Sequence, residues 1–205
     1  MPPRPRTTPR KMPRQERSQA TVDAILDATA RILVGIGYDR ASTNRIAAAA
    51  GVSIGSLYQY FPNKEALVAA LVERHIAEMT AVITTKLAEM KDVDCAVAAR
   101  EIVAAQLDAH MVDPKLHKVL MEQVPRTGRL ERLVGVERAM QALVRAELER
   151  RLPELRLTNL DVAAFVLVNA VEGVTHAAMM RYPNEVPREE LQRELTDLLI
   201  RYLKE

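Results

Sequence analysis

A pentapeptide in the N-terminal third has the residue types and spacing of a catalytic motif. Gly51-Val52-Ser53-Ile54-Gly55 matches G-x-S-x-G, the turn that presents the nucleophile of serine hydrolases. That turn needs a β-strand before the serine, whereas Ile46 to Ala50 is rich in alanine and favours a helix. We therefore expect no catalytic residue and no enzymatic activity, and a hydrolase that uses Ser53 is the minor alternative.

Histidine and carboxylate residues in the C-terminal half could bind a metal ion or a polar ligand. His110 and His117 lie two turns apart near acidic residues, but a proline breaks the helix between them, so no metal site and no cofactor are predicted. Asn169, Glu172 and His176 recur on one face of the most apolar predicted helix. Because buried polar groups need partners, these three could bind an effector or a partner subunit.

Residues 42–65 predict a helix-turn-helix. Apolar side chains at helical spacing indicate a helix from Thr43 to Ala50, and Gly51 supplies the left-handed conformation of a turn. Ser53 can cap a second helix over residues 54–60, which the proline at position 62 ends. Four of the seven Phe and Tyr residues lie in or beside this segment, where their hydroxyl groups and polar neighbours are suited to bind nucleic acid.

The distribution of charge favours a nucleic-acid partner for the same end of the chain. Residues 1–65 contain ten Lys and Arg against five Asp and Glu, and residues 66–205 contain nineteen against twenty-two. A basic segment attracts phosphate groups. Residues 1–14 contain five prolines and little to bury, so we expect a disordered basic arm, for which a merely solvated tail is the alternative.

The composition indicates a globular protein. Apolar residues make up 48% of the chain, enough for a sizeable core. No run approaches the roughly 18 to 20 uninterrupted apolar residues of a membrane span, and the N-terminus lacks the apolar segment of a signal peptide. The single cysteine, Cys95, cannot form an internal disulfide. We therefore expect a cytoplasmic protein that does not bind a membrane.

The periodicity of apolar residues predicts an all-α fold of about nine helices. Three helices over residues 15–62 form a domain that contains the helix-turn-helix, and a long helix from Lys64 leads into a second, helical domain over residues 63–205. The helix from Asn159 to about Arg181 is apolar on nearly every side and must be covered on two faces.

A set of residues in and around the helix-turn-helix matches the signature of a known family. These residues are Thr43, Ile46-Ala47, Ala50-Gly51-Val52-Ser53, Gly55, Leu57-Tyr58, Tyr60-Phe61 and Lys64-Glu65-Ala66-Leu67. With them the N-terminal third resembles the TetR (tetracycline repressor) family of bacterial transcriptional regulators over roughly residues 15–70.

The resemblance implies a homodimer whose DNA-binding domain, residues 15–62, binds successive major grooves of a palindromic operator in double-stranded DNA. It also implies that residues 63–205 are an effector-binding and dimerisation domain, in which a small molecule releases the DNA, and a repressor by family expectation. A helical ligand-binding module without DNA binding is a further alternative.

The matching positions suggest how DNA would be bound. Gln59 is the best candidate for reading bases, because its amide can bond two edge atoms of adenine, and Arg45 and Ser56 are weaker candidates. Gly55 would let the helix approach base edges closely, and Lys64 would bind a phosphate. The full set of predicted DNA contacts is Ser42, Thr43, Arg45, Ser53, Gly55, Ser56, Tyr58, Gln59, Tyr60 and Lys64.

The C-terminal half provides two further sets of expected contacts. An effector pocket for an apolar small molecule would use adaptable methionines together with polar residues, although plain core filling also explains the methionines. Its expected residues are His110, Met111, Met121, Met140, Asn169, Glu172 and His176. The last two helices would form the dimer through Phe165, Met179, Leu191, Leu195, Leu198 and Tyr202.

Overall fold

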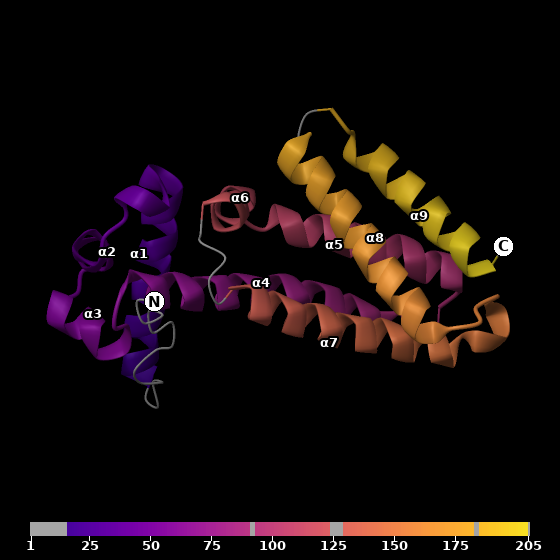
Figure 1. Ribbon diagram of the computed structural model, residues 1–205, viewed down its shortest axis with the longest axis horizontal. Coiled ribbons are helices and arrows are strands. Elements are labelled where there is room, and N and C mark those ends of the chain that lie inside the picture. The colour runs from indigo at the N-terminus through magenta and orange to yellow at the C-terminus, as the bar shows by residue number, and fades with distance from the viewer. Residues whose placement is uncertain (1–15, 91–92, 124–128, 183–184, 205) are drawn as a thin grey trace, which may run out of the picture. The chain divides into compact units, whose positions relative to one another are not determined.

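The computed structural model describes residues 16–90, 93–123, 129–182 and 185–204, with side chains described from residue 18 and not between 124 and 134. This part of the chain is helical without a strand, which confirms the all-α prediction, and the expected arm over residues 1–14 lies outside it (Figure 1). The helices are α1 (Glu16–Arg40), α2 (Thr43–Ala50), α3 (Ile54–Tyr60), α4 (Lys64–Glu89), α5 (Cys95–Met111), α6 (Pro114–Glu122), α7 (Arg129–Arg150), the 3-10 helix η1 (Leu152–Glu154), α8 (Leu160–Arg181) and α9 (Arg188–Lys204).

The chain divides into two compact units. Unit 1 is built from the described residues of Met1–Ile76 and Lys115–Leu130, and unit 2 from those of Ala77–Pro114 and Glu131–Glu205. These units differ from the predicted domains, 15–62 and 63–205, because the start of α4 and most of α6 share the core of the N-terminal helices. The functional division into a DNA-binding and an effector-binding domain stays a prediction.

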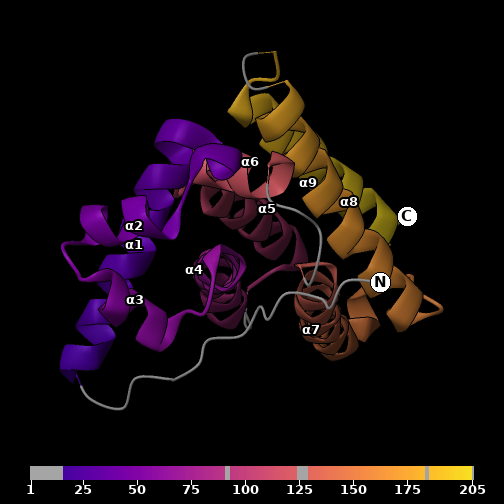
Figure 2. The ribbon, with the colours of Figure 1, turned by 60° about the vertical axis from the view of Figure 1, so that its left-hand side comes forward.

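The core of unit 1 joins helices that are too short to be stable alone. α2 packs against both α1 and α3, as Figure 2 shows. Ile46, Leu57 and Phe61 are fully buried, as predicted, and Leu71 of α4 and Leu120 of α6 are buried in the same cluster. Helices of seven or eight residues gain their stability from such packing rather than from their own propensity.

The end of α1 contains a break that only glycine adopts easily. Gly37 has φ 78° and ψ 168°, a backbone conformation in which a side chain is strained, and it separates the main helix from its last turn. Gly35, two residues earlier, stays within the helix. The backbone N–H of Tyr38 donates to Oε1 of Gln123 at 3.1 Å, which fastens this break to the residue that follows α6.

The core of unit 2 is built around α5, which packs against both α8 and α9. Figures 1 and 2 show α8 and α9 running side by side. Asn159 caps α8, since its Oδ1 accepts from the backbone N–H groups of Asp161 and Val162, both at 3.1 Å. Cys95 is a buried thiol, and its pKa is raised by burial.

A buried arginine links the ends of three segments of unit 2. The Arg151 guanidinium donates to the carbonyl of Val93 at 2.6 Å and to the carbonyl of Met90 at 2.5 Å, and its Nε donates to Glu147 at 2.7 Å. The residue is 7% exposed. A buried charge is tolerated only where it is bonded in this way.

Within the described part of the chain, α8 is covered on one face. Ala163, Leu167 and Val171 are buried in the core of unit 2, whereas Phe165 on the other side is 54% exposed. By length and composition α8 is the one described helix that could cross a membrane. The sequence analysis predicted no membrane span here, because Glu172 interrupts the run of apolar residues. The second covering face predicted for this helix is absent from the described part of a single chain.

Two of the α9 side chains that were expected at the dimer interface are buried within the chain itself. Leu191 and Leu195 are 8% and 3% exposed and face the core of unit 2, together with Leu199 and Leu203, so they are not available to a partner subunit. Of the other expected dimer residues, Met179 is partly buried against the same core. Phe165, Leu198 and Tyr202 are exposed.

The two glycines at the end of α1 make a matched pair of substitutions. We expect Gly37→Ala to lower the free energy of unfolding by about 1–3 kcal/mol, because the residue would be strained at this φ and ψ. Its new Cβ would also lie 2.8 Å from Gln123 Oε1. Gly35→Ala, in a helix with no atom within 4 Å, should raise that free energy by up to about 1 kcal/mol. Urea unfolding followed by circular dichroism measures both, and equal effects would contradict this account.

Candidate functional site

The helix-turn-helix of unit 1 is formed by local signals that the sequence contains. Gly51 ends α2 with φ 68° and ψ 26°, the left-handed conformation. Ser42 caps α2 by accepting from the Arg45 N–H at 3.4 Å, and Ser53 caps α3 by accepting from the Ser56 N–H at 3.0 Å. Asn63 caps α4 through the Ala66 N–H at 2.8 Å, as predicted. Helix starts and turn thus follow from residue type.

One side of this helix pair is buried and the other is exposed. Leu57 of α3 lies in the core of unit 1, while its neighbours Tyr58 and Gln59 face outward. Arg45 of α2 is also exposed, and Tyr60 is half-buried against the core. The exposed set therefore consists of hydrogen-bonding side chains on two adjacent helices.

Two polar contacts order the edges of this surface. The hydroxyls of Thr43 and Tyr58 share a hydrogen bond of 3.1 Å between α2 and α3. Nζ of Lys64 donates to the carbonyl of Tyr38 at 3.0 Å and lies 4.1 Å from the centre of its ring. Burial, then the nearby Glu65 carboxylate, raises the pKa of Tyr38, which keeps the phenol neutral. The contact between Tyr38 and Lys64 could not be predicted from the sequence, because the fold alone brings these two residues together.

Ser53 does not occupy a nucleophile elbow. Its φ of −68° and ψ of 149° are ordinary extended values, whereas the elbow is a strained turn that follows a strand. Its hydroxyl caps α3 and shares a hydrogen bond of 2.8 Å with the hydroxyl of Ser56. The described residues before it form α2, with no strand.

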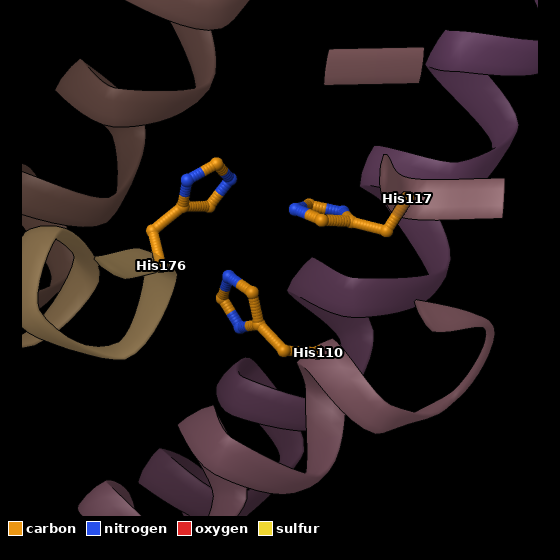
Figure 3. Close-up of side chains that lie close together, drawn as sticks. All are labelled: His110, His117 and His176. Carbon is orange, nitrogen blue, oxygen red and sulfur yellow. The ribbon is translucent and has the colours of Figure 1, made fainter. Parts of the chain in front are cut away.

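Three of the seven residues expected in an effector pocket come together in unit 2. His110 projects from α5, and Glu172 and His176 project from one face of α8. Nε2 of His110 lies 3.6 Å from Oε1 of Glu172, and the His110 and His176 rings meet edge to face with centroids 5.7 Å apart (Figure 3). Gln106, which the sequence did not single out, donates its amide N–H to Oε2 of Glu172. The four side chains form a polar cluster between two apolar helices.

The surroundings shift the two imidazole pKa values in opposite directions. Burial alone would lower the pKa of His110, but its hydrogen bond to Glu172, the charge of that carboxylate and the carbonyl of Gln106 raise it above the ordinary value. For His176 burial is the largest influence and lowers the pKa, against the opposing charge of Glu172. As the pH falls, His110 therefore becomes protonated before His176.

The other four expected pocket residues do not join this cluster. Met111 is 50% exposed, and Asn169 is exposed, with its amide bonded to the carbonyl of Phe165 at 2.9 Å, so their place in a pocket stays a prediction. Met140 is half-buried on α7, and Met121 belongs to α6 in unit 1.

His117, the other histidine considered as a metal ligand, belongs to unit 1. Its Nδ1 lies 2.9 Å from Nε2 of His75, and both residues are 2% exposed. Sequence reasoning did not single out His75, since the two histidines of this buried pair lie on different helices.

Comparison with protein families identifies both halves of the chain. Residues 25–71 match the model described as bacterial regulatory proteins, tetR family. Residues 96–203, more than half of the chain, match the model described as tetracyclin repressor-like, C-terminal domain.

Two relatives extend the comparison. The nucleoid occlusion factor SlmA of Haemophilus ducreyi is 32% identical over 94 residues, which span 43% of this chain and 46% of SlmA, less than half of that protein. The HTH-type transcriptional regulator BetI of Cronobacter sakazakii is 26% identical over 184 residues, 86% of this chain and 87% of BetI.

Solved structures share the fold. A TetR-family transcriptional regulator from Mesorhizobium loti has a TM-score of 0.75 at 18% identity, over 93% of this chain and 100% of its own. SmeT, in a complex with triclosan, has a TM-score of 0.67 at 24% identity, over 91% of this chain and 93% of its own. At these identities the likeness establishes the fold alone.

The cap of α3 can be tested by removing one hydroxyl. We expect Ser53→Ala to lower the free energy of unfolding by about 1 kcal/mol, because the N–H of Ser56 loses its acceptor. Ser56→Ala is the matched control, since it removes a hydroxyl of the same pair and leaves that backbone bond in place, so its effect should be smaller. Thermal unfolding of the two variants measures the difference, and an equal loss would refute the cap.

Proposed function

Because this chain belongs to the TetR family of bacterial regulatory proteins, we propose that it is a homodimeric DNA-binding regulator of transcription that responds to a small effector. It acts as a repressor that leaves a palindromic operator when the effector binds unit 2. The observation that carries the proposal is the pair α2 and α3, whose inner side is packed in a core and whose outer side presents hydrogen-bonding residues. A cytoplasmic location follows from this role.

The outer surface of α2 and α3 is suited to the major groove. Gln59 is exposed on α3, and its amide can donate to and accept from one adenine edge. Gly55 lies one turn before Gln59. A Cβ at this position would contact only Ser53 Oγ, at 3.8 Å, so packing within the protein does not require a glycine here. The missing side chain instead leaves room for DNA. Arg45 and Ser56 flank this position as further base or phosphate contacts.

Phosphate binding is assigned to the edges of the same surface. Ser42 and Thr43 stand at the N-terminus of α2, where unpaired amides and hydroxyls favour an anion. The Thr43–Tyr58 hydrogen bond holds both hydroxyls at this edge. Tyr60 and Lys64 complete the set, with Lys64 exchanging its bond to the Tyr38 carbonyl for a phosphate oxygen.

Dimerisation is assigned to the uncovered faces of α8 and α9. Large apolar side chains are exposed on both helices, and contiguous apolar surfaces of this kind are typical of protein interfaces. A second copy of the chain supplies the second covering face that α8 needs. The exposed residues are Val162, Phe165, Val166, Val174, Leu198 and Tyr202.

The effector is assigned to unit 2, at the polar cluster between α5 and α8. His110, Glu172 and His176 provide polar contacts, and the hydroxyl of Thr175 is buried without a hydrogen-bond partner among the described residues. A small molecule with one polar group and an apolar body matches this mixture of side chains. The complex of SmeT with triclosan is a precedent from a protein of the same fold.

Two variants distinguish the reading of bases from the binding of phosphates. We expect Gln59→Ala to relax the preference at one operator position by about 1–3 kcal/mol, because the amide contact to a base is lost. Lys64→Ala should weaken all sequences about equally and reduce the slope of log affinity against log salt by about one. Selection of bound sites from random DNA, followed by salt titration, measures both.

Circular dichroism of Lys64→Ala is the control, because this side chain also bonds the Tyr38 carbonyl. If the wild-type protein shows no preference for any palindrome over random DNA, the proposal that it regulates transcription from a specific operator is rejected. That outcome would leave a helical ligand-binding module as the function.

Substitutions on α9 can distinguish residues of the proposed dimer surface from residues of the core of unit 2. We expect Leu198→Asp, at a side chain 51% exposed, to give a folded monomer, because the charge would be buried in the interface. Leu195→Asp, at a side chain 3% exposed, should instead unfold unit 2. Arg193→Asp is the control for a charge change on the exposed polar side of α9. Sedimentation velocity and circular dichroism distinguish the three outcomes, and a dimeric Leu198→Asp protein would refute this interface.

A further inference from the structure

The backbone of Tyr38 is bonded on both sides, and its two side-chain partners come from different parts of unit 1. Its N–H donates to Oε1 of Gln123 at 3.1 Å, and its carbonyl accepts from Nζ of Lys64 at 3.0 Å. We propose that Gln123 is a positioning residue for DNA binding: by fixing Tyr38 it holds the Lys64 ammonium in a resting position and limits the contact of Lys64 with phosphate. This proposal rests on the proposed function, which assigns Lys64 to a phosphate.

The ammonium group of Lys64 lies in a defined position against the end of α1. Besides its bond to the Tyr38 carbonyl, Nζ lies 4.1 Å from the centre of the Tyr38 ring, and the residue is half-buried. A cation over an aromatic face and a cation at the C-terminal end of a helix are both held by electrostatic attraction. To bind a phosphate, the ammonium must exchange these contacts, so they oppose the binding of DNA.

The position of the Tyr38 carbonyl depends on the break at Gly37. Because Gly37 leaves the helical conformation, Tyr38 begins a separate turn, in which the N–H of Ala41 donates to the Tyr38 carbonyl at 3.2 Å. One isolated turn has little stability of its own. The bond from the Tyr38 N–H to Gln123 therefore fixes the turn, and with it the acceptor that Lys64 uses.

Gln123 itself is fixed by α6. Its backbone N–H donates to the carbonyl of Val119 at 3.0 Å, and Val119 and Leu120 are buried in the core of unit 1. The amide is packed closely against the break, since a Cβ on Gly37 would lie 2.8 Å from Oε1. The glutamine side chain is exposed, so it can be replaced without opening the core.

A purely structural role for Gln123 predicts the opposite effect on DNA affinity. If the residue only stabilised unit 1, its loss would loosen the helix-turn-helix and weaken the binding of DNA. A residue that holds Lys64 in a resting position instead lowers the affinity of the wild type, because the fraction of molecules with a free ammonium is reduced. Removal of Gln123 then raises the affinity.

The affinity for a fluorescein-labelled duplex of random sequence tests this, because phosphate binding does not depend on base sequence. We expect Gln123→Ala to bind about two- to tenfold more tightly than the wild type, which is the effect of one hydrogen bond. The same substitution should have no effect in a Lys64→Ala background, because the group that it releases is absent. Gln141→Ala is the matched control, since the Gln141 amide donates to Glu137 within α7 of unit 2, and it should bind as the wild type does.

The Lys64 side chain can also be followed directly by NMR. The ring of Tyr38 should shift the ε-methylene signal of Lys64 away from the signals of the other lysines, and the loss of this signal in Lys64→Ala identifies it. We expect the signal to move toward the other lysines in Gln123→Ala. Gln123→Glu keeps an acceptor oxygen for the Tyr38 N–H and should leave the signal in place.

The two measurements separate failure of this proposal from failure of the proposed function. Weaker or unchanged binding by a folded Gln123→Ala protein overturns the proposal, as does an equal gain in the Lys64→Ala background. If no variant binds DNA, the wild type included, the proposed function is refuted, and an unchanged NMR signal in Gln123→Ala then overturns the positioning of Lys64 as well. Should Gln123→Ala fail to fold, Gln123→Met, which keeps the length of the side chain without its amide, replaces it in both experiments.

Discussion

A helix that is apolar on nearly every side must be covered on two faces, and α8 imposes this constraint on unit 2. One face packs into the core with α5 and α9, which places Ala163, Leu167 and Val171 inside. The same packing brings Glu172 and His176 against His110 of α5. The opposite face, with Phe165, is exposed and belongs to the proposed dimer interface. The polar cluster and the proposed interface are therefore two consequences of how one helix is buried.

Unit 1 depends on a related constraint, which is the small size of α2 and α3. Helices of this length are marginal in water, so they form only against a core that other elements supply. α1, the start of α4 and most of α6 provide it, and Leu57 and Phe61 are the side chains that α3 and its end contribute. With the inner side occupied, Tyr58 and Gln59 can only point outward. The proposed DNA surface therefore consists of the side chains that remain outside once the inner side of α3 is packed in the core.

Two sets of polar side chains inside unit 2 differ in what they can do. Arg151 bonds two backbone carbonyls and a glutamate where three segments meet, and it is a structural cation. His110 and Gln106 are bonded around a carboxylate that is half exposed, so that cluster can exchange partners with a ligand. Arg151 and the cluster around Glu172 differ in exposure. A bound molecule or ion can replace a hydrogen-bond partner only where it can reach the group.

The sequence by itself determined the elements whose signals are local. Gly51, Ser53 and Asn63 set a turn and two caps through bonds to atoms at most four residues away, so their roles could be read without the fold. The burial of Ile46, Leu57 and Phe61 followed from helical spacing in the same short stretch. The family resemblance rests on these positions.

Only the tertiary structure decided which of two equivalent faces is buried. α9 carries adjacent apolar residues at 198 and 199 and again at 202 and 203, so stripes through either member of each pair fit helical spacing equally well. Packing against α5 chose Leu199 and Leu203 and left Leu198 and Tyr202 outside. His110 and His176 met for the same reason: contacts between distant helices depend on how those helices pack, which no local pattern contains.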